Sequence, residues 1–378
     1  MAATALAPQL AAPVVPERAT PLETLRIWSL HLLCFALPVS TLAFLLTAPH
    51  RWWGALPWFA VIVGSVILDK RSAPEHRQPA ARLARWPFDA VLYGLAAMQL
   101  ASVALAADVV SANGFWRIDT LVMFVLVGVN SGYCGIVVAH ELIHRREKHM
   151  QWLGRVLLGS VLYEHFATEH VRGHHARVGT PEDPATARFG ETYQAFFVRT
   201  VPAQFNSAWR LECHRMGDAE MPLWDRRQLH NRVLHGLVAE WSFAFAIAAV
   251  LGVGAFAFHL LQSLSAIRLL EAVNYFEHWG IVRRGKKPSP LDSWDTDSRF
   301  TLYTLVGLSR HADHHAFATR PYQQLRHWDE SPKLPSGYFG TVEMVLFGNR
   351  EFRRLMTAEL ERRKLGPFVE ADGYALSQ

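Results

Sequence analysis

Six long apolar stretches limit this chain to a helical bundle that crosses a membrane. Each stretch is close to the ~20 apolar residues that an α-helix needs to span the hydrocarbon core. Inside lipid the backbone must satisfy its own hydrogen bonds, and this requirement favours helices. The sequence therefore predicts an all-α integral membrane protein of about six transmembrane helices with a histidine-rich helical cap. The predicted spans are residues 27–47, 52–68, 90–107, 118–139, 233–258 and 259–280.

The connections between the spans predict their pairing. Residues 48–51 are so few that the first two spans should form a hairpin. Gly252 and Gly254 are the candidates for the turn of a second hairpin, made by the fifth and sixth spans. Residues 1–26 are predicted to be a flexible cytoplasmic tail and residues 27–378 a single domain, with a cap built from residues 140–232 and 281–378.

Positive charge is concentrated on one side of the predicted bundle. The formal net charge is +5, yet the short connections at 48–51 and 108–117 carry one Arg each. Nearly all other Lys and Arg residues fall on the opposite side, which the positive-inside rule assigns to the cytoplasm. Because the basic runs flank apolar segments, they suit a membrane surface better than a nucleic acid.

Histidines gather in four clusters on this predicted cytoplasmic side. His140 and His144 are four residues apart, so on a helix their imidazoles lie on one face, one turn from each other. The other clusters lie in the motifs EHVRGHH, NYFEHWG and RHADHH. Together the four clusters contain nine of the chain's 19 histidines: His140, His144, His170, His174, His175, His278, His311, His314 and His315.

These histidines predict a metal centre. Nine imidazoles are too many ligands for one ion, but they suit two. Imidazole binds iron, copper or zinc, so the residue type alone leaves the metal open. Neutral ligands do not cancel the charge of the metal, so acidic neighbours are expected to orient the rings and offset that charge. Four acidic residues sit beside a cluster histidine and are the candidates for this supporting catalytic role: Glu141, Glu169, Glu277 and Asp313.

The chain carries no motif for an organic or iron–sulfur redox cofactor. Cys34, Cys134 and Cys213 form no C-x-x-C pair, so they cannot build a rubredoxin-type iron site. No G-x-G-x-x-G motif follows a predicted strand. We therefore predict no cofactor-binding residues beyond the metal ligands, and any electrons must come from another protein.

The motifs HELIHR, EHVRGHHARVGTPEDPATAR, NYFEHWG and LSRHADHHAFATRPYQ resemble those of the membrane-bound alkane 1-monooxygenases. These are non-haem di-iron hydroxylases related to membrane fatty-acid desaturases and xylene-type methyl hydroxylases. The resemblance runs from about residue 118 to about residue 350. All nine histidines are kept, whereas Trp279, Ala312 and Gly179 stand where the family commonly has Tyr, Ser and Ala.

The resemblance implies that two iron ions activate O2 and place one oxygen atom in the terminal methyl group of a medium- or long-chain n-alkane. No side chain can attack an unactivated C–H bond, so the metals must supply the oxidant. It further implies a rubredoxin as electron donor, itself reduced by an NAD(P)H-dependent reductase, and a place in the bacterial inner membrane with the site facing the cytoplasm. The apolar substrate would enter sideways from lipid. The number of subunits stays open, and a homo-oligomer is among the arrangements that this interpretation allows.

Other interpretations of the same residues were weighed. HELIH also matches the zinc-protease motif, but a protease would leave seven of the nine clustered histidines without a role. A transporter would be expected to carry polar residues within its spans, and the predicted spans are nearly free of them. Within the enzyme class, the alternatives are a fatty-acyl hydroxylase or desaturase and an aromatic methyl hydroxylase of the xylene type.

Overall fold

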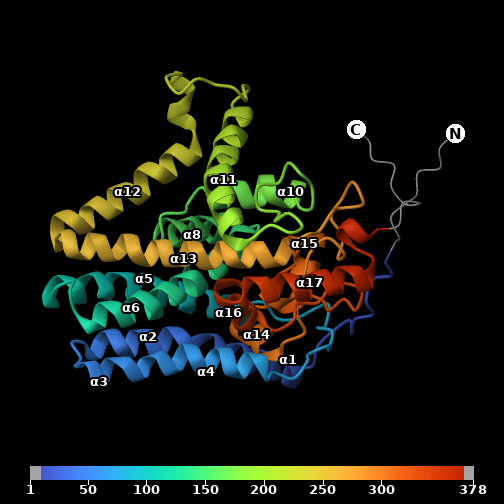
Figure 1. Cartoon of the computed structure of the whole chain (residues 1–378), viewed down its shortest axis with the longest axis horizontal. Coiled ribbons are helices and arrows are strands. Elements are labelled where there is room, and N and C mark those ends of the chain that lie inside the picture. Colours follow the sequence, from blue (N-terminus) through green and yellow to red (C-terminus); the bar gives the residue numbers. More distant parts are fainter. Residues whose placement is uncertain (1–9, 370–378) are drawn as a thin grey trace.

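The computed structural model describes residues 10–369, and these residues form helices and loops without an extended strand. Long helices run side by side through the molecule, and shorter ones gather toward one end (Figure 1). Six helical segments of the described part are long and apolar enough to cross a membrane, which confirms the predicted fold class. They are Pro21–Thr47, Trp52–Lys70, Trp86–Asn113, Ile118–Ile143, Arg232–Leu251 and Val253–His278.

The first two spans run in opposite directions on either side of residues 48–51 (Figure 1). The first span begins at Pro21 rather than at the predicted residue 27, because Thr20 caps it. The Thr20 hydroxyl accepts the backbone N–H of Glu23 at 3.2 Å, and proline suits a first helical turn. Of the predicted tail, residues 1–9 lie outside the described residues. The elements are α1 (Pro21–His31), η1 (Leu32–Phe35), α2 (Ala36–Thr47), α3 (Trp52–Ala55), η2 (Leu56–Trp58) and α4 (Phe59–Lys70).

The fourth span changes helix type along its length, unlike the third, which is the single helix α5 (Trp86–Asn113). It starts as α6 (Ile118–Asn130), continues as the π-helical segment η3 (Ser131–Val137) and ends as α7 (Val138–Ile143). A π-helical turn contains more residues than an α-helical one, so it rotates α7 about the helix axis relative to α6. The direction in which His140 points therefore depends on η3.

The fifth and sixth spans are α12 (Arg232–Leu251) and α13 (Val253–His278), and their turn lies at Gly252. Gly252 has a φ of 87°, a left-handed value that glycine adopts without strain. Gly254, the other candidate, lies within α13. The predicted boundary between these spans at residues 258–259 is therefore too far along the chain.

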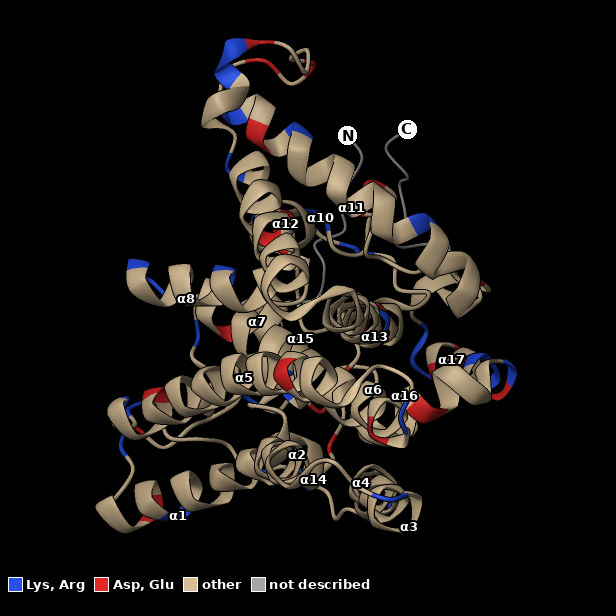
Figure 2. Ribbon diagram, turned by 90° about the vertical axis from the view of Figure 1, so that its left-hand side faces the viewer, with Lys and Arg blue, Asp and Glu red and all other residues tan. Residues whose placement is uncertain are grey.

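Shorter helices complete the structure around the end at which α4, α7 and α13 finish. Among them, α11 runs away from the bundle and leads back through η5 to α12 (Figure 1). Figure 2 shows Lys, Arg, Asp and Glu mainly on these outer elements and at helix ends. They are α8 (Lys148–Gly159), α9 (Phe166–Glu169), π-helical η4 (His170–His174), α10 (His175–Arg177), α11 (Tyr193–Arg215), η5 (Arg226–His230), α14 (Arg299–Thr304), η6 (Leu308–Arg310), α15 (His311–Ala316), η7 (Tyr322–Gln324), α16 (Tyr338–Phe347), α17 (Asn349–Arg363) and η8 (Gly366–Phe368).

The central helix is α13, which packs against α5, α6, α11, α12 and α16. Its last turns contribute Tyr275 and Phe276 to a continuous apolar core. The following Trp279 and Trp294 are fully buried, and the Trp294 indole N–H donates to the Trp279 carbonyl at 2.9 Å. Because this packing fixes the end of α13, it also fixes His278 beside the short helices.

Candidate metal centre

All nine predicted histidines lie in one cluster at the end of the bundle where α7 and α13 finish. Imidazole centroids from different segments are close, for example 4.7 Å apart for His174 and His278 and 4.3 Å apart for His175 and His315. Four segments supply them: α7 and its C-cap (His140, His144), η4 with α10 (His170, His174, His175), the last residue of α13 (His278) and α15 (His311, His314, His315).

The cluster divides into two groups of ligand atoms. In the first group, five histidines offer nitrogen atoms that all lie within 4.8 Å of one another. In the second group, His174, His278 and His315 do the same, and His311 joins this group through His278. Such a division is what two ions require. The five members of the first group are His140, His144, His170, His175 and His314.

The ring nitrogens face one another in a way that a cation would satisfy. The Nε2 atoms of His170 and His175 are 3.0 Å apart, and those of His175 and His314 are 3.2 Å apart. Buried nitrogens of His140, His144 and other cluster members have no hydrogen-bond partner in the described residues. An unsatisfied buried polar atom is costly, and a bound metal ion removes that cost. The donor set therefore fits a pair of transition-metal ions.

Burial keeps the cluster histidines in the protonation state that binds metal. It lowers the pKa of the imidazoles outside the spans well below the usual value, and the neighbouring imidazoles lower it further. A neutral imidazole has a free lone pair, so these rings are ready to ligate at neutral pH. The affected residues are His144, His170, His175, His311, His314 and His315.

Asp183 orients a ligand of the second group, and the sequence did not single it out. Its Oδ2 is 2.8 Å from His174 Nδ1 and accepts the Thr186 hydroxyl at 2.6 Å. Burial alone would raise the pKa of Asp183, but His174 and Thr186 hold it below its usual value. The carboxylate therefore fixes the ring and leaves Nε2 for metal. Asp183 lies inside the GTPEDP segment, nine positions after His174, a spacing that no helical rule connects.

Glu277 contacts the same group from α13. Its Oε2 lies 3.2 Å from His311 Nε2, and its Oε1 accepts the Tyr338 hydroxyl at 2.6 Å. Tyr338 comes from α16, so this hydrogen bond joins two helices at the centre. Of the four predicted acidic residues, Glu277 is the one that an ion-pair contact joins to a cluster imidazole among the described residues.

The other three predicted carboxylates bind arginines. Arg145 forms an ion pair with Glu141, with its Nε 2.8 Å from Glu141 Oε1, and Arg177 donates to Glu169 at 2.7 Å. Asp313 pairs with Arg320 and accepts the indole N–H of Trp328 at 2.8 Å. These bonds tie the histidine-bearing helices to neighbouring segments. A supporting role for Glu141, Glu169 and Asp313 in catalysis stays a prediction.

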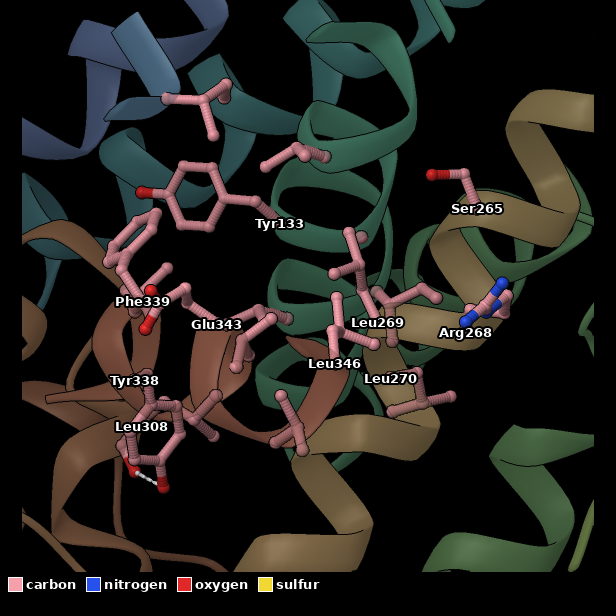
Figure 3. A pocket seen from close by; sticks show the side chains of 18 of the residues that line it. Tyr133, Ser265, Arg268, Leu269, Leu270, Leu308, Tyr338, Phe339, Glu343 and Leu346 are labelled. Carbon is pink, nitrogen blue, oxygen red and sulfur yellow. Dashed lines mark hydrogen bonds between the residues drawn. The ribbon is translucent and has the colours of Figure 1, made fainter. Parts of the chain in front are cut away.

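A cavity of about 860 Å³ lies beside the centre. Its walls come from α4, α6, η3, α13 and α16 and are mostly apolar. Figure 3 shows Phe339 and Leu269 on different sides of it. At its inner end Glu277 and three ligand candidates reach the cavity surface, so a molecule inside it would meet the centre directly. Those three histidines are His140, His170 and His311.

Six apolar spans and a polyhistidine cluster at one end define a membrane-bound protein with a candidate metal centre, and the comparisons with known proteins agree with this class. The family model described as fatty acid desaturase matches residues 115–341. The chain is 40% identical over 232 residues to alkane 1-monooxygenase 1 of Pseudomonas aeruginosa, an alignment that covers 58% of each protein. It is 33% identical over 343 residues to alkane 1-monooxygenase 2 of the same organism, which covers 85% of this chain and 90% of that relative.

A more distant relative is the xylene/toluene monooxygenase hydroxylase component of Pseudomonas putida, 25% identical over 297 residues, or 75% of this chain and 76% of the relative. Within the desaturase-like class, the chain belongs to the alkane 1-monooxygenase family. It is therefore an oxidoreductase of the monooxygenase type, as its motifs predicted.

Proposed function

We propose that the protein hydroxylates the terminal methyl group of medium- or long-chain n-alkanes. The reaction consumes one O2, two electrons and two protons. One oxygen atom enters the C–H bond to give a primary alcohol, and the other leaves as water. The observation that carries this proposal is the apolar cavity that ends at the cluster histidines. Its volume lies in the range of small-molecule sites, and an alkane offers nothing but an apolar surface for such walls to recognise.

Two iron ions fit the two histidine groups, one ion to each group. When bound there, iron supplies the redox chemistry that activates O2, which no amino-acid side chain can provide. The chain's own residues have separate tasks. Asp183 fixes the His174 ring, and Glu277 with Tyr338 can hold a proton at the inner end of the cavity. The apolar walls keep water away from the substrate.

The substrate is proposed to enter sideways from the bilayer. The walls of the cavity belong to spanning helices, and α4 and α13 contribute to it from different sides (Figure 3). An alkane dissolves in the hydrocarbon core, so a route through the surrounding water would be slower. We place the protein in the bacterial inner membrane with the centre toward the cytoplasm, because the positive-inside rule favours that orientation.

We propose a rubredoxin as the electron donor, reduced in turn by an NAD(P)H-dependent reductase. The absence of any redox-cofactor motif in the sequence supports an external donor. An acidic donor would be steered by basic residues near the centre. Among the arginines near the centre, Arg145 is buried and paired with Glu141 and Asp89, so it cannot contribute. Arg146 and Arg284 are exposed and remain candidates.

The test combines metal analysis with a product assay. Membranes containing the protein, a rubredoxin, its reductase and NADH should convert n-alkanes to primary alcohols, and the purified protein should contain two irons per chain. His174→Ala and His311→Ala should abolish product and lower bound iron while the protein still inserts in the membrane. His214→Ala changes an exposed histidine of α11 outside the cluster and serves as the control. Full hydroxylation by either cluster variant would overturn the ligand assignment.

A further inference from the structure

Glu271 is an acidic side chain buried deep inside a span. Of the Asp and Glu residues in the six described spans, Glu240 and Glu271 alone lie more than six residues from an end. Glu271 lies seven residues before the end of α13, and its side chain is fully buried. An acidic residue at such a depth is costly in a membrane protein, and it marks a functional pathway more often than a structural contact.

Three polar side chains contact the Glu271 carboxyl group, and none of them is a cation. The Tyr163 hydroxyl and the Gln204 amide each donate to Oε1 at 2.9 Å. The Asn274 amide lies 3.2 Å from Oε2. No Lys, Arg or His of the described residues forms an ion pair with Glu271. An ionised carboxylate here would be a buried charge without a counterion, which is unfavourable, so we expect Glu271 to carry a proton.

Glu271 begins a polar line along α13 that ends at the metal centre. The intervals from Glu271 to Asn274 and from Asn274 to His278 are three and four residues, so the three side chains lie on one face of the helix. Asn274 lines the inner cavity together with Glu277. At 1.5 Å per residue, seven residues place Glu271 roughly 10 Å from the ligand candidate His278. Since Oε1 already accepts two hydrogen bonds, Oε2 can carry the proton, and the amide beside it offers an acceptor.

The other side of Glu271 faces α11, which crosses α13 (Figure 1). Gln204 donates to the Thr200 hydroxyl at 3.0 Å as well as to Glu271, and Thr200 donates to the Pro184 carbonyl at 2.8 Å. Pro184 lines a second cavity, of about 1000 Å³, that follows α11 and has exposed residues such as Arg210 in its wall. Hydrogen bonds therefore link Glu271 to the walls of an outer and an inner cavity.

We propose that Glu271 is a proton-relay residue, which supplies protons from the α11 side to the histidine centre during hydroxylation. This inference rests on the proposed function, whose reaction consumes two protons and releases one water. In each transfer the Oε2–H bond of Glu271 breaks, and the proton passes along the Asn274 side of α13 to a water molecule at the inner end of the cavity. Solvent then returns a proton to the carboxylate from the α11 side. Two such cycles supply both protons and leave Glu271 unchanged.

A purely structural role for Glu271 is the alternative, because the same hydrogen bonds tie α11 and the segment before α9 to α13. The two roles make opposite predictions for two substitutions. Glu271→Gln keeps the length of the side chain and an acceptor oxygen but cannot release a proton. Glu271→Asp keeps the acid but is one methylene shorter. A relay tolerates Asp better than Gln, whereas a structural contact tolerates Gln better than Asp.

The kinetic test measures dodecane hydroxylation in membranes supplied with the rubredoxin system. In Glu271→Gln we expect kcat to fall about 100-fold, the lower end of what a positioned proton donor contributes, with KM and iron content unchanged. Glu271→Asp should recover part of that loss. Glu240→Gln changes the other deep carboxyl group, which accepts the backbone N–H of Glu164 at 3.0 Å and does not line the inner cavity, and should behave as the wild type. A kcat near the wild-type value in Glu271→Gln, or a larger loss in Glu271→Asp than in Glu271→Gln, would overturn the relay.

A second measurement needs neither turnover nor metal. Infrared absorption of the metal-free protein in nanodiscs at neutral pH should contain a carboxylic-acid C=O band that shifts in D2O. This band should be missing in Glu271→Gln and should persist in Glu240→Gln. A carboxylate band in its place would also overturn the proposal. Failure of dodecane conversion by the wild-type protein would instead count against the proposed function, and the infrared band would then decide whether Glu271 holds a proton.

Discussion

At the residue scale, the two ligand groups differ in their acidic neighbours. Asp183 contacts His174 and Glu277 contacts His311, and both histidines belong to the second group. No carboxylate of the described residues forms an ion pair with a member of the five-histidine group. A metal held by neutral imidazoles alone keeps its full charge, whereas a nearby carboxylate offsets part of it. The two sites should therefore differ in affinity and in reduction potential.

Asp183→Asn tests this difference. The amide keeps the shape of the side chain but loses the charge that fixes His174, so metal affinity at the second group should fall 10- to 100-fold. Metal analysis should then find iron content falling from two toward one per chain, with a parallel loss of turnover. Glu182→Gln, at the exposed neighbouring position, should behave as the wild type. Full iron content and activity in Asp183→Asn would contradict the assignment.

Tyr338→Phe tests the partner of Glu277. It removes the hydroxyl that donates to Glu277 at 2.6 Å and leaves the ring in the core. We expect turnover of dodecane to fall several-fold, because the Glu277 carboxylate loses the hydrogen bond that orients it. Iron content should stay unchanged, because all the histidine ligands remain. Tyr275→Phe removes the hydroxyl of a buried tyrosine that donates to the Glu191 carbonyl instead and serves as the control. Equal effects of both changes would indicate a general packing role.

At the scale of elements, the two π-helical segments place the histidines. The segment η3 ends just before α7, and η4 contains His170 and His174. Each extra residue per turn rotates the side chains that follow, so ligands from different helices can face the same point. The HELIH spacing correctly indicated that His140 and His144 share a face. It did not indicate η3, because the residues of this segment, SGYCGIV, are small or apolar throughout and carry no alternation of polar and apolar positions from which a turn length could be inferred.

The cavity extends along α6 and α13, and its length should set the longest alkane that the protein accepts. Val125 lines the cavity fifteen residues before His140, far from the centre. Val125→Trp should fill that end and lower the turnover of long alkanes relative to short ones by roughly tenfold, about 1.4 kcal/mol, because the indole occupies space that the far end of a long chain needs. Leu121→Trp changes an exposed residue of the same helix that does not line the cavity. A product assay across chain lengths should find no shift in that control. The same chain-length preference in both variants would show that the far end of the cavity does not determine which alkane lengths are accepted.

Much of the fold and part of the centre could be predicted from sequence, for physical reasons. Long apolar runs are sufficient to predict spans, because lipid leaves the backbone no alternative. Helical spacing predicts which histidines of one motif share a face. Contacts between segments far apart in the chain could not be predicted in this way. Asp183 with His174, and the division of the histidines into groups of five and four, depend on how loops and helices pack, which no local pattern encodes. The start of α1 at Pro21 was missed because its capping Thr20 precedes a stretch of mixed polarity.

At the scale of the whole molecule, the metal centre joins the bundle to the short helices. Its candidate ligands come from α7 and α13, which are ends of spans, and from η4, α10 and α15, which are not. A ligand that binds only the folded protein stabilises it, so removing iron should loosen these elements from the bundle. A chelator should lower the Tm of the purified protein, and added ferrous iron should restore it. His174→Ala should start from the lower Tm and respond less to iron. Equal Tm values with and without iron would contradict this role.

The position of Tyr338 has one more consequence. The same side chain forms part of the cavity wall and holds Glu277 at the metal centre. A substrate that displaced the Tyr338 side chain would also displace Glu277, which lies 3.2 Å from His311. Filling of the cavity and the geometry of the histidine cluster are therefore linked through a single hydrogen bond.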